Sequence, residues 1–394
     1  MSSPRKPRPR TKMTNGVMRR GATWSYTLYT PNLDADGKPL GGKGRTTWVG
    51  GFATKEAAQI AKREAQNSKD KGEAVEPIRQ SLREYVEQSW LPAVAANVKP
   101  TSASSYRQSI AHALTVIGDK KIQRLTPTDV QGMVTKLLAD GRTPRTVGKT
   151  LTVLRIAMKH AVTLRVIPRD PTTGIQKPLV ETVRRRTMTM AEVAAIDAAS
   201  RDTTWSAFVR LALYTGCRRG ENLALTWKDC ELDGDNPTIT IRRNVVDVDG
   251  KRIEQTPKNG KEREVTIDTE TVSILRAHKA SQNAARLRLG SDWNALDLVT
   301  CLADGSPPMP HSATQAWSRL CKTAKIEHHN LHNARHTHAT TLLEADVPLH
   351  VVADRLGHLD AMVTATIYAH VTTARRASTA EVFAAAVDTA TAAR

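Results

Sequence analysis

The chain has 394 residues, and its 58 lysines and arginines outnumber 39 aspartates and glutamates, which gives a formal net charge of +19. This length predicts two or three domains, and the charge indicates a polyanionic partner such as nucleic acid rather than a merely solvated surface. No apolar run reaches the roughly 18–20 residues of a membrane span, and the N-terminus lacks the apolar core of a secretory signal. The four cysteines form no Cys-x-x-Cys pair, which favours a reducing compartment over a zinc knuckle. We therefore expect a cytoplasmic, nucleoid-associated protein.

The N-terminal part is predicted to contain a basic arm and a small folded module. Residues 1–20 carry seven lysines and arginines, three prolines and no acid. Such a segment is typical of a flexible arm, which either solubilises the chain or lies in a DNA groove. Residues 21–72 alternate in polarity over two predicted strands, and Thr54 then precedes a helical stretch. A small basic sheet of this kind can enter a major groove.

The rest of the chain divides into two predicted units. Residues 76–175 have helical periodicity, with prolines where helices begin, and predict an all-helical bundle. The proline-containing segment 176–186 is typical of a linker. Residues 187–394 predict a mixed, mainly helical domain that ends in a C-terminal helix. Within it, residues 251–267 are interpreted as a β-hairpin that turns at Asn259 and Gly260.

Two segments of the third unit carry basic residues suited to phosphate binding. In Thr-Gly-Cys-Arg-Arg-Gly-Glu, Gly216 interrupts a helix and Arg218 stands where the next helix begins. A guanidinium at that place can hold a phosphate with two hydrogen bonds, although a single arginine there is more often a surface residue. Lys258, near the predicted turn, can reach a bound substrate or remain solvated.

Three further segments follow in order. His332 and Arg335 are three residues apart and share one face of a predicted helix. The i,i+4 pair His332 and His336 suggests a metal site, but the zinc-protease motif requires Glu at position 333, where this chain has Asn. His358 follows a Leu-Gly pair, and Tyr368 lies ten residues later in Ile-Tyr-Ala-His. A single tyrosine usually has a structural role.

Together, the order Arg…Lys…His-x-x-Arg…His…Tyr resembles the motif boxes of the tyrosine recombinase (phage integrase) family. The resemblance is most specific in residues 211–221 and 331–370. It implies a helical core-binding domain before a mainly α catalytic domain, with no metal or cofactor. The implied site comprises the phosphate-binding Arg218 and Arg335, the pocket residues His332 and His358, the general acid Lys258, the orienting residue Glu221 and the nucleophile Tyr368. Lys261 remains open as the alternative acid.

The same resemblance implies partners. Residues 21–72 are similar in place to the arm-binding domain of phage-type integrases, which implies contact with double-stranded DNA at both core and arm attachment sites. The family further implies a tetramer on DNA, and accessory bending or directionality factors as additional partners. Residues 380–387 are expected to pack either on a neighbouring subunit or on their own domain.

Three other functions are consistent with parts of this pattern. A dimer-resolving recombinase of the Xer type shares the catalytic boxes but is typically shorter and lacks the arm module. A DNA-binding regulator on the same fold would have lost the reaction, yet every expected catalytic residue is present. A type IB topoisomerase shares the chemistry but not the core-binding layout. The sequence therefore favours an integrase that inserts, and also excises, a phage or mobile element.

Overall fold

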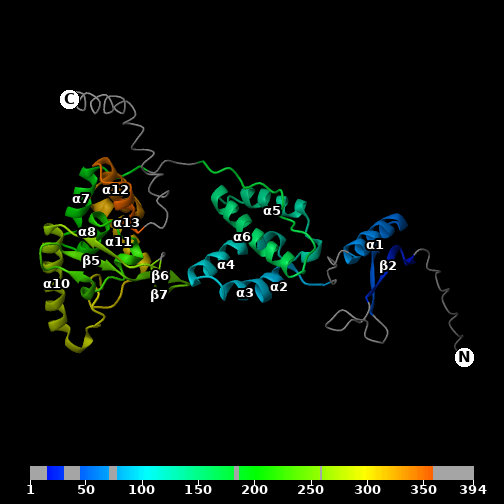
Figure 1. The fold of residues 1–394 in the computed structure, drawn as a ribbon, viewed down its shortest axis with the longest axis horizontal. Helices are drawn as coiled ribbons and strands as arrows, with labels where there is room; N and C mark the ends of the chain where they lie inside the picture. The colour runs from blue at the N-terminus through cyan, green and yellow to red at the C-terminus, as the bar shows by residue number, and fades with distance from the viewer. Residues whose placement is uncertain (1–15, 31–44, 71–77, 182–185, 258–259, 358–394) are drawn as a thin grey trace, which may run out of the picture. The chain divides into compact units, whose positions relative to one another are not determined.

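The computed structural model describes residues 16–30, 45–70, 78–181, 186–257 and 260–357 (Figure 1). Internal contacts divide the chain into two compact units, Met1–Val180 and Glu181–Arg394. No helix in the described ranges is long and apolar enough to cross a membrane.

The first unit begins with a three-stranded antiparallel sheet covered by one helix. The strands β1 (Val17–Arg20), β2 (Thr23–Thr30) and β3 (Arg45–Phe52) lie in that order, and α1 (Lys55–Asp70) packs against one face. The backbone N–H of Ala57 donates to Oγ1 of Thr54 at 3.1 Å, so Thr54 caps the helix as the sequence predicts.

The strand β1 corrects one sequence-based expectation. Composition placed all of residues 1–20 in a flexible arm, yet Val17–Arg20 pair with β2 in antiparallel register. Val17 is fully buried and lies opposite Tyr26, itself buried. The basic composition of residues 1–20 gave no sign of this strand. Backbone pairing and one buried side chain are enough to add an edge strand to an existing hairpin, and neither depends on an apolar composition.

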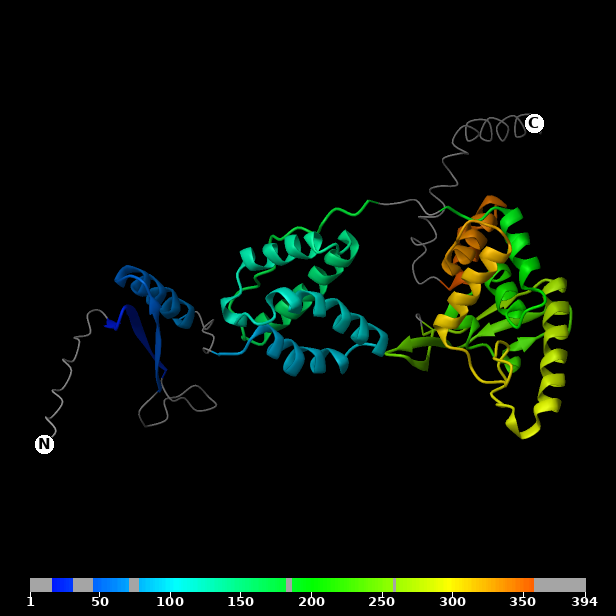
Figure 2. The same cartoon turned by 180° about the vertical axis from the view of Figure 1, so that it is seen from behind.

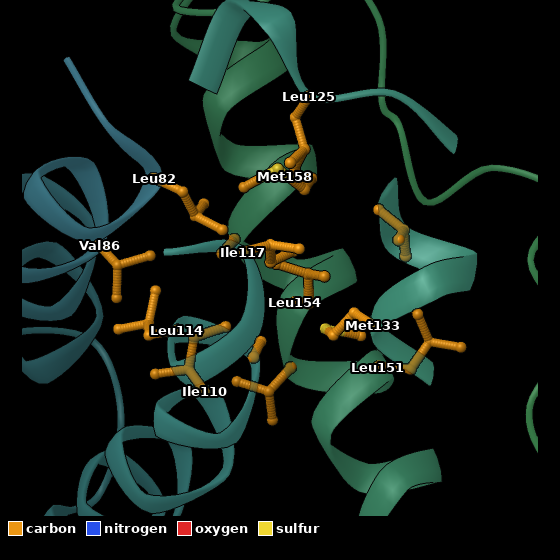
Figure 3. Packing of buried hydrophobic residues seen from close by; sticks show 14 of the residues in the cluster. Leu82, Val86, Ile110, Leu114, Ile117, Leu125, Met133, Leu151, Leu154 and Met158 are labelled. Atoms are coloured by element: carbon orange, nitrogen blue, oxygen red, sulfur yellow. The ribbon is translucent and has the colours of Figure 1, made fainter. Parts of the chain in front are cut away.

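A helical bundle completes the first unit. Its elements are α2 (Leu82–Tyr85), the π-helical turn η1 (Val86–Trp90), α3 (Leu91–Ala95), α4 (Pro100–Ile117), η2 (Ile122–Arg124), α5 (Pro127–Ala139) and α6 (Pro144–Thr163). Thr126 and Thr143 cap α5 and α6 just before their first prolines. Aliphatic side chains from α2, α4, α5 and α6 meet in one core, which Figure 3 shows around Leu114, Leu154 and Met158.

The second unit combines short strands with a larger set of helices (Figure 2). Its helices are α7 (Met190–Ser200), α8 (Ser206–Tyr214), α9 (Arg219–Asn222), η3 (Trp227–Asp229), α10 (Thr269–Leu289), η4 (Gly290–Asp292), α11 (Pro310–Thr323), α12 (Leu331–Glu344) and α13 (Leu349–Leu356). Its strands are β4 (Cys230–Glu231), β5 (Thr238–Ile241), β6 (Asn244–Val248), β7 (Lys251–Gln255) and β8 (Arg263–Thr266). α8 is buried along most of its length and lies at the centre of this unit.

The expected hairpin over residues 251–267 is wrong. β7 pairs with β6, whereas β8 pairs with β5 in a separate sheet of order β4-β5-β8. The hairpin turn is instead Asp249-Gly250, where both residues have positive φ, at 52° and 78°. A two-residue Asp-Gly loop of this conformation matches the twist of paired strands. The segment with Lys258 therefore connects two sheets rather than forming the tip of one hairpin.

Candidate active site

Arg218 is positioned by the break between α8 and α9. α8 ends at Tyr214, and Gly216 follows with a left-handed φ of 65°. Arg218 is the extended N-cap residue of α9, and its backbone N–H donates to Oε2 of Glu221 at 3.0 Å. Its guanidinium Nη1 donates to Oε1 of the same carboxylate at 2.7 Å. Glu221 thus orients both the backbone and the side chain of Arg218.

Arg335 lies in the first turns of α12 and is buried. Its Nη1 donates to the carbonyl oxygen of Gly216 at 2.8 Å, and its Nη2 donates to that of Leu356 at 2.6 Å. Burial, together with the charge of Arg218, lowers the pKa of Arg335 to about 9. The carbonyl dipoles at two helix C-termini stabilise this buried charge.

The two arginines line one cavity of about 270 Å³. Its walls also include Arg219 and the exposed His332, and the whole set is Cys217, Arg218, Arg219, Thr314, Asn330, Leu331, His332 and Arg335. Arg219 donates from Nη1 to Oγ1 of Thr314 at 2.7 Å. Among the described residues, the walls of this small cavity carry several cationic donors and no carboxylate, which suits an anionic group.

Glu221 holds a second arginine that the motif boxes did not reveal. Arg263, the first residue of β8, donates from Nη2 to Oε2 of Glu221 at 2.6 Å and from Nη1 to Oε1 at 3.2 Å. Although burial opposes ionisation of Glu221, its hydrogen bonds and the charges of Arg263 and Arg218 keep its pKa below the usual value. Each carboxylate oxygen therefore accepts two N–H groups.

The last three backbone carbonyls of the α13 terminus each accept a hydrogen bond from a different arginine. The pairs are Arg263 Nε with Arg355 O at 3.0 Å, Arg335 Nη2 with Leu356 O at 2.6 Å, and Arg218 Nη2 with Gly357 O at 3.2 Å. We call Arg218, Arg263 and Arg335 the arginine clasp. The clasp satisfies carbonyls that the helix itself leaves without a partner.

His338 and Arg355 form a second connection behind the cavity. Nδ1 of His338 lies 3.0 Å from the carbonyl oxygen of Leu213, and Arg355 donates from Nε to Nε2 of His338 at 3.1 Å. Burial and the charge of Arg355 lower the pKa of His338 to about 4. The ring is therefore neutral at pH 7, with its proton on Nδ1 directed at Leu213.

The structure brings together four of the residues expected from the sequence: Arg218, Glu221, His332 and Arg335. Lys258, His358 and Tyr368 lie outside the described residues, as does the segment 380–387. Lys261, the alternative acid, is exposed. Sequence reasoning gave no role in the site to Arg263, Arg355 or His338, because their hydrogen-bond partners Glu221, Thr266 and Leu213 lie far from them along the chain.

Comparisons with known proteins find relatives over most of the chain. The descriptions "Phage integrase family" and "Phage integrase, N-terminal SAM-like domain" match residues 186–375 and 81–138 respectively. A "Tyrosine recombinase XerC-like" protein of Caldanaerobacter subterraneus subsp. tengcongensis is 26% identical over 381 residues, which span 91% of this chain and 95% of that protein. An integrase of Streptomyces ambofaciens is 24% identical, over 81% of this chain and 84% of that one.

Solved structures share the fold. The Tn1549 transposon integrase bound to transposon right-end DNA matches 76% of this chain and all of that chain, with 17% identity and a TM-score of 0.62. A lambda integrase tetramer bound to a Holliday junction matches 91% of this chain and 96% of that one, with 15% identity and a TM-score of 0.56. The two family matches cover part of the helical bundle and most of the second unit. The chain belongs to the phage integrase family and is a tyrosine recombinase.

Proposed function

We propose that this recombinase breaks and rejoins DNA strands by attack of Tyr368 on a phosphodiester held between Arg218 and Arg335. The observation that carries the proposal is the convergence of both guanidiniums, with His332, on one cavity of about 270 Å³. Two N–H groups of Arg335 donate to fixed carbonyls, so its guanidinium is held rigidly before any substrate binds. Preorganised donors of this kind stabilise the charge that develops on a phosphoryl group during attack.

In the proposed reaction the phenolic oxygen of Tyr368 forms a bond to phosphorus and the bond from phosphorus to the 5′ oxygen breaks. The phenol passes its proton to one of the assisting histidines, His332 or His358, and the surrounding positive charge favours the phenolate. Lys258 donates a proton to the departing 5′ oxygen, with Lys261 as the alternative donor. The products are a 3′-phosphotyrosyl link and a free 5′-hydroxyl. A 5′-hydroxyl from a partner duplex then reverses the step without a cofactor, and His332 and His358 assist the proton transfers.

A nicked suicide duplex tests the reaction. The duplex carries the attachment site of the element that encodes the chain, and its nick lets the short 5′-hydroxyl fragment diffuse away after cleavage. The wild-type protein is expected to form a covalent adduct that survives denaturing electrophoresis, and Tyr368→Phe is expected to form none. A wild type without an adduct contradicts the catalytic proposal. An adduct that persists in Tyr368→Phe assigns the nucleophile to another residue.

We also propose that the N-terminal module, residues 21–72 together with β1, binds arm-type DNA sites. The sheet face opposite α1 carries two exposed aromatic side chains, Tyr29 (55% exposed) and Trp48 (44% exposed). The guanidinium of Arg20 lies 4.7 Å from the centre of the Trp48 ring. A small sheet whose face carries cationic and aromatic side chains can enter a major groove, which admits a β-ribbon.

This second proposal implies an integrase with two kinds of DNA site rather than a Xer-type resolving enzyme, and the family resemblance further implies that it acts as a tetramer on DNA. The double substitution Arg20→Ala with Trp48→Ala is expected to reduce integration between attachment sites in cells by at least about tenfold, because two contacts with the second DNA site are lost. The same variant should still cleave the suicide duplex. Ile60→Ala, in α1 of the same module and 58% exposed, is the matched control and should integrate normally. Normal integration by the double variant refutes the arm proposal.

A further inference from the structure

Arg263 occupies a place in the site that the proposed chemistry does not use. It lies on β8, in a different element from Arg218 (before α9) and Arg335 (in α12). Its side chain is 11% exposed, and all three of its guanidinium nitrogens donate hydrogen bonds. Two of them hold the carboxylate of Glu221, and Nε holds the carbonyl oxygen of Arg355. Arg263 therefore links Glu221, which holds Arg218, to the end of α13.

The charge of Arg263 affects how strongly Glu221 holds Arg218. The carboxylate of Glu221 is 1% exposed, and a buried carboxylate must be compensated by neighbouring cations. With Arg263 present, two guanidiniums share one carboxylate, and Arg218 keeps part of its positive charge for another anion. Without Arg263, Glu221 has Arg218 as its only partner in the clasp, and the pair would approach neutrality.

The packing around Gly357 fixes the same end of α13. Gly357 has a left-handed φ of 64°, and a Cβ atom at this position would lie 2.9 Å from Nη1 of Arg263. The carbonyl oxygen of Gly357 accepts a bond from Nη2 of Arg218. The residue that follows in the chain is His358. The contacts of Arg263 with Arg355 and Gly357 thus help to fix the position of the backbone immediately before His358, which is one of the expected site residues.

We propose that Arg263 is a positioning residue for strand cleavage, which it supports by balancing the charge of Glu221 and holding the end of α13 against the clasp. The inference rests on the proposed function, since it requires Arg218 to bind the scissile phosphate. It assigns Arg263 no contact with DNA.

The experiment separates DNA binding from cleavage in the full-length chain. Binding of the unnicked attachment-site duplex is measured by gel shift, and the rate of adduct formation on the nicked duplex is measured with enzyme in excess. Arg263→Ala is expected to slow cleavage by about 10²-fold, the effect of misplacing a reacting group by about 1 Å. Its affinity for the duplex should stay within about threefold. Arg263→Lys should recover about tenfold of the lost rate, because an ammonium balances the charge but cannot hold the carboxylate with a planar fork.

Arg276→Ala is the matched control. Arg276 also bonds one carboxylate and one carbonyl, those of Asp233 and Leu232, but it does so with a side chain that is 57% exposed and outside the clasp. The Arg276→Ala variant should cleave at the wild-type rate. Equal rates for Arg263→Ala and the wild type overturn the inference, whereas failure of the wild type to form an adduct overturns the proposed function instead.

A double-mutant cycle with Glu221→Gln tests whether Arg263 acts through Glu221. If it does, removing Arg263 in the Glu221→Gln background should slow cleavage by much less than the loss of about 10²-fold expected in the wild type, because only the bond to the end of α13 is then lost. Rate losses that multiply in the double variant would show that Arg263 does not act through Glu221 and would overturn the inference. Should Arg263→Ala fail to fold, the same cycle is read with Arg263→Lys, whose expected loss is smaller but also non-additive.

Discussion

Nη1 of Arg335 donates to the carbonyl oxygen of Gly216 at 2.8 Å, across 119 residues of sequence. The bond joins the helix that carries Arg335 to the turn that positions Arg218, the other arginine of the proposed phosphate site. Gly216 can present its carbonyl in this direction because its φ is 65°, a conformation that side chains disfavour. The geometry of the cavity therefore depends on a bond between one buried side chain and one backbone atom.

Arg335→Lys is expected to lose both stability and cleavage. A lysine cannot reach the carbonyls of Gly216 and Leu356 together, and leaving one buried carbonyl without a partner costs about 1–3 kcal/mol. Removal of one preorganised donor should slow adduct formation by about 10²–10³-fold. Urea denaturation and suicide-substrate cleavage measure the two effects.

Arg210→Lys provides the control for that variant. Arg210 is equally buried in the same unit, where it bonds Asp197, Asp268 and Thr271, but it does not line the cavity. The Arg210→Lys variant should lose about as much free energy of unfolding as Arg335→Lys, while its folded fraction cleaves at the wild-type rate. Equal cleavage losses in the two variants would contradict a specific role for Arg335.

Gly216→Ala should destabilise the second unit. An added Cβ would lie 2.7 Å from Cδ2 of Leu356 and 3.0 Å from Cδ2 of His338, at a φ that alanine disfavours. Backbone strain and overpacking together should cost about 2–4 kcal/mol, measured by thermal or urea denaturation. Gly132→Ala, exposed in α5 with nothing within 4 Å of the new Cβ, should instead stabilise its helix by about 0.5–1 kcal/mol. A Gly216→Ala protein as stable as the wild type would show that the turn tolerates a side chain.

The pH dependence of stability should report on His338. Its pKa is lowered to about 4 in the folded chain, below the ordinary 6.5 of an exposed histidine. As pH falls from 6.5 to 4, the unfolded chain binds a proton that the folded chain does not, so stability is complete above this window and is lost within it. The loss from this one group should reach about 2–3 kcal/mol.

His338→Gln removes that titration. A glutamine amide can donate to the carbonyl of Leu213 and accept from Arg355, so the connection behind the cavity is retained. The difference in free energy of unfolding between variant and wild type should therefore shift in favour of the variant between pH 6.5 and pH 4. A difference that stays constant over this range would show that His338 does not carry the effect.

The choice between Lys258 and Lys261 as general acid can be tested with a modified substrate. A duplex whose scissile 5′ oxygen is replaced by sulfur has a leaving group that needs no proton. On the normal duplex, alanine at the acid position should slow cleavage by about 10²–10⁴-fold. On the sulfur duplex the same variant should cleave within about tenfold of the wild type.

We expect this rescue for Lys258→Ala, and for Lys261→Ala if that residue is the acid. Tyr368→Phe is the control, because a better leaving group cannot replace a missing nucleophile. If sulfur rescues neither lysine variant, neither residue donates the proton.

Sequence features that span only a few residues predicted much of the architecture. Prolines and capping threonines set the beginnings of α5 and α6, and alternating polarity identified β2 and β3. These features depend on residues only a few positions apart, so they can be recognised without tertiary information. The spacing of His332 and Arg335 likewise placed both on one helix and, in the fold, on one cavity.

The pairing of the strands was harder to predict from the sequence. The Asn-Gly pair at 259–260 and the Asp-Gly pair at 249–250 both predict turns, and only the second closes a hairpin. The choice depends on which partner buries Ile239, Ile241 and Val265, and these residues lie together only in the folded sheet. Pairing energy arises from cross-strand neighbours, so it is not encoded in either turn alone.

By itself, the sequence indicated the class of chemistry, because the order of its arginine, lysine, histidine and tyrosine side chains resembles that of the tyrosine recombinases. The tertiary structure decided how that set is held. Glu221 with Arg263, and Arg335 with Gly216 and Leu356, are pairs between elements distant in sequence. Buried charges and helix-terminal carbonyls need partners wherever the fold brings them, and those partners follow no spacing along the chain.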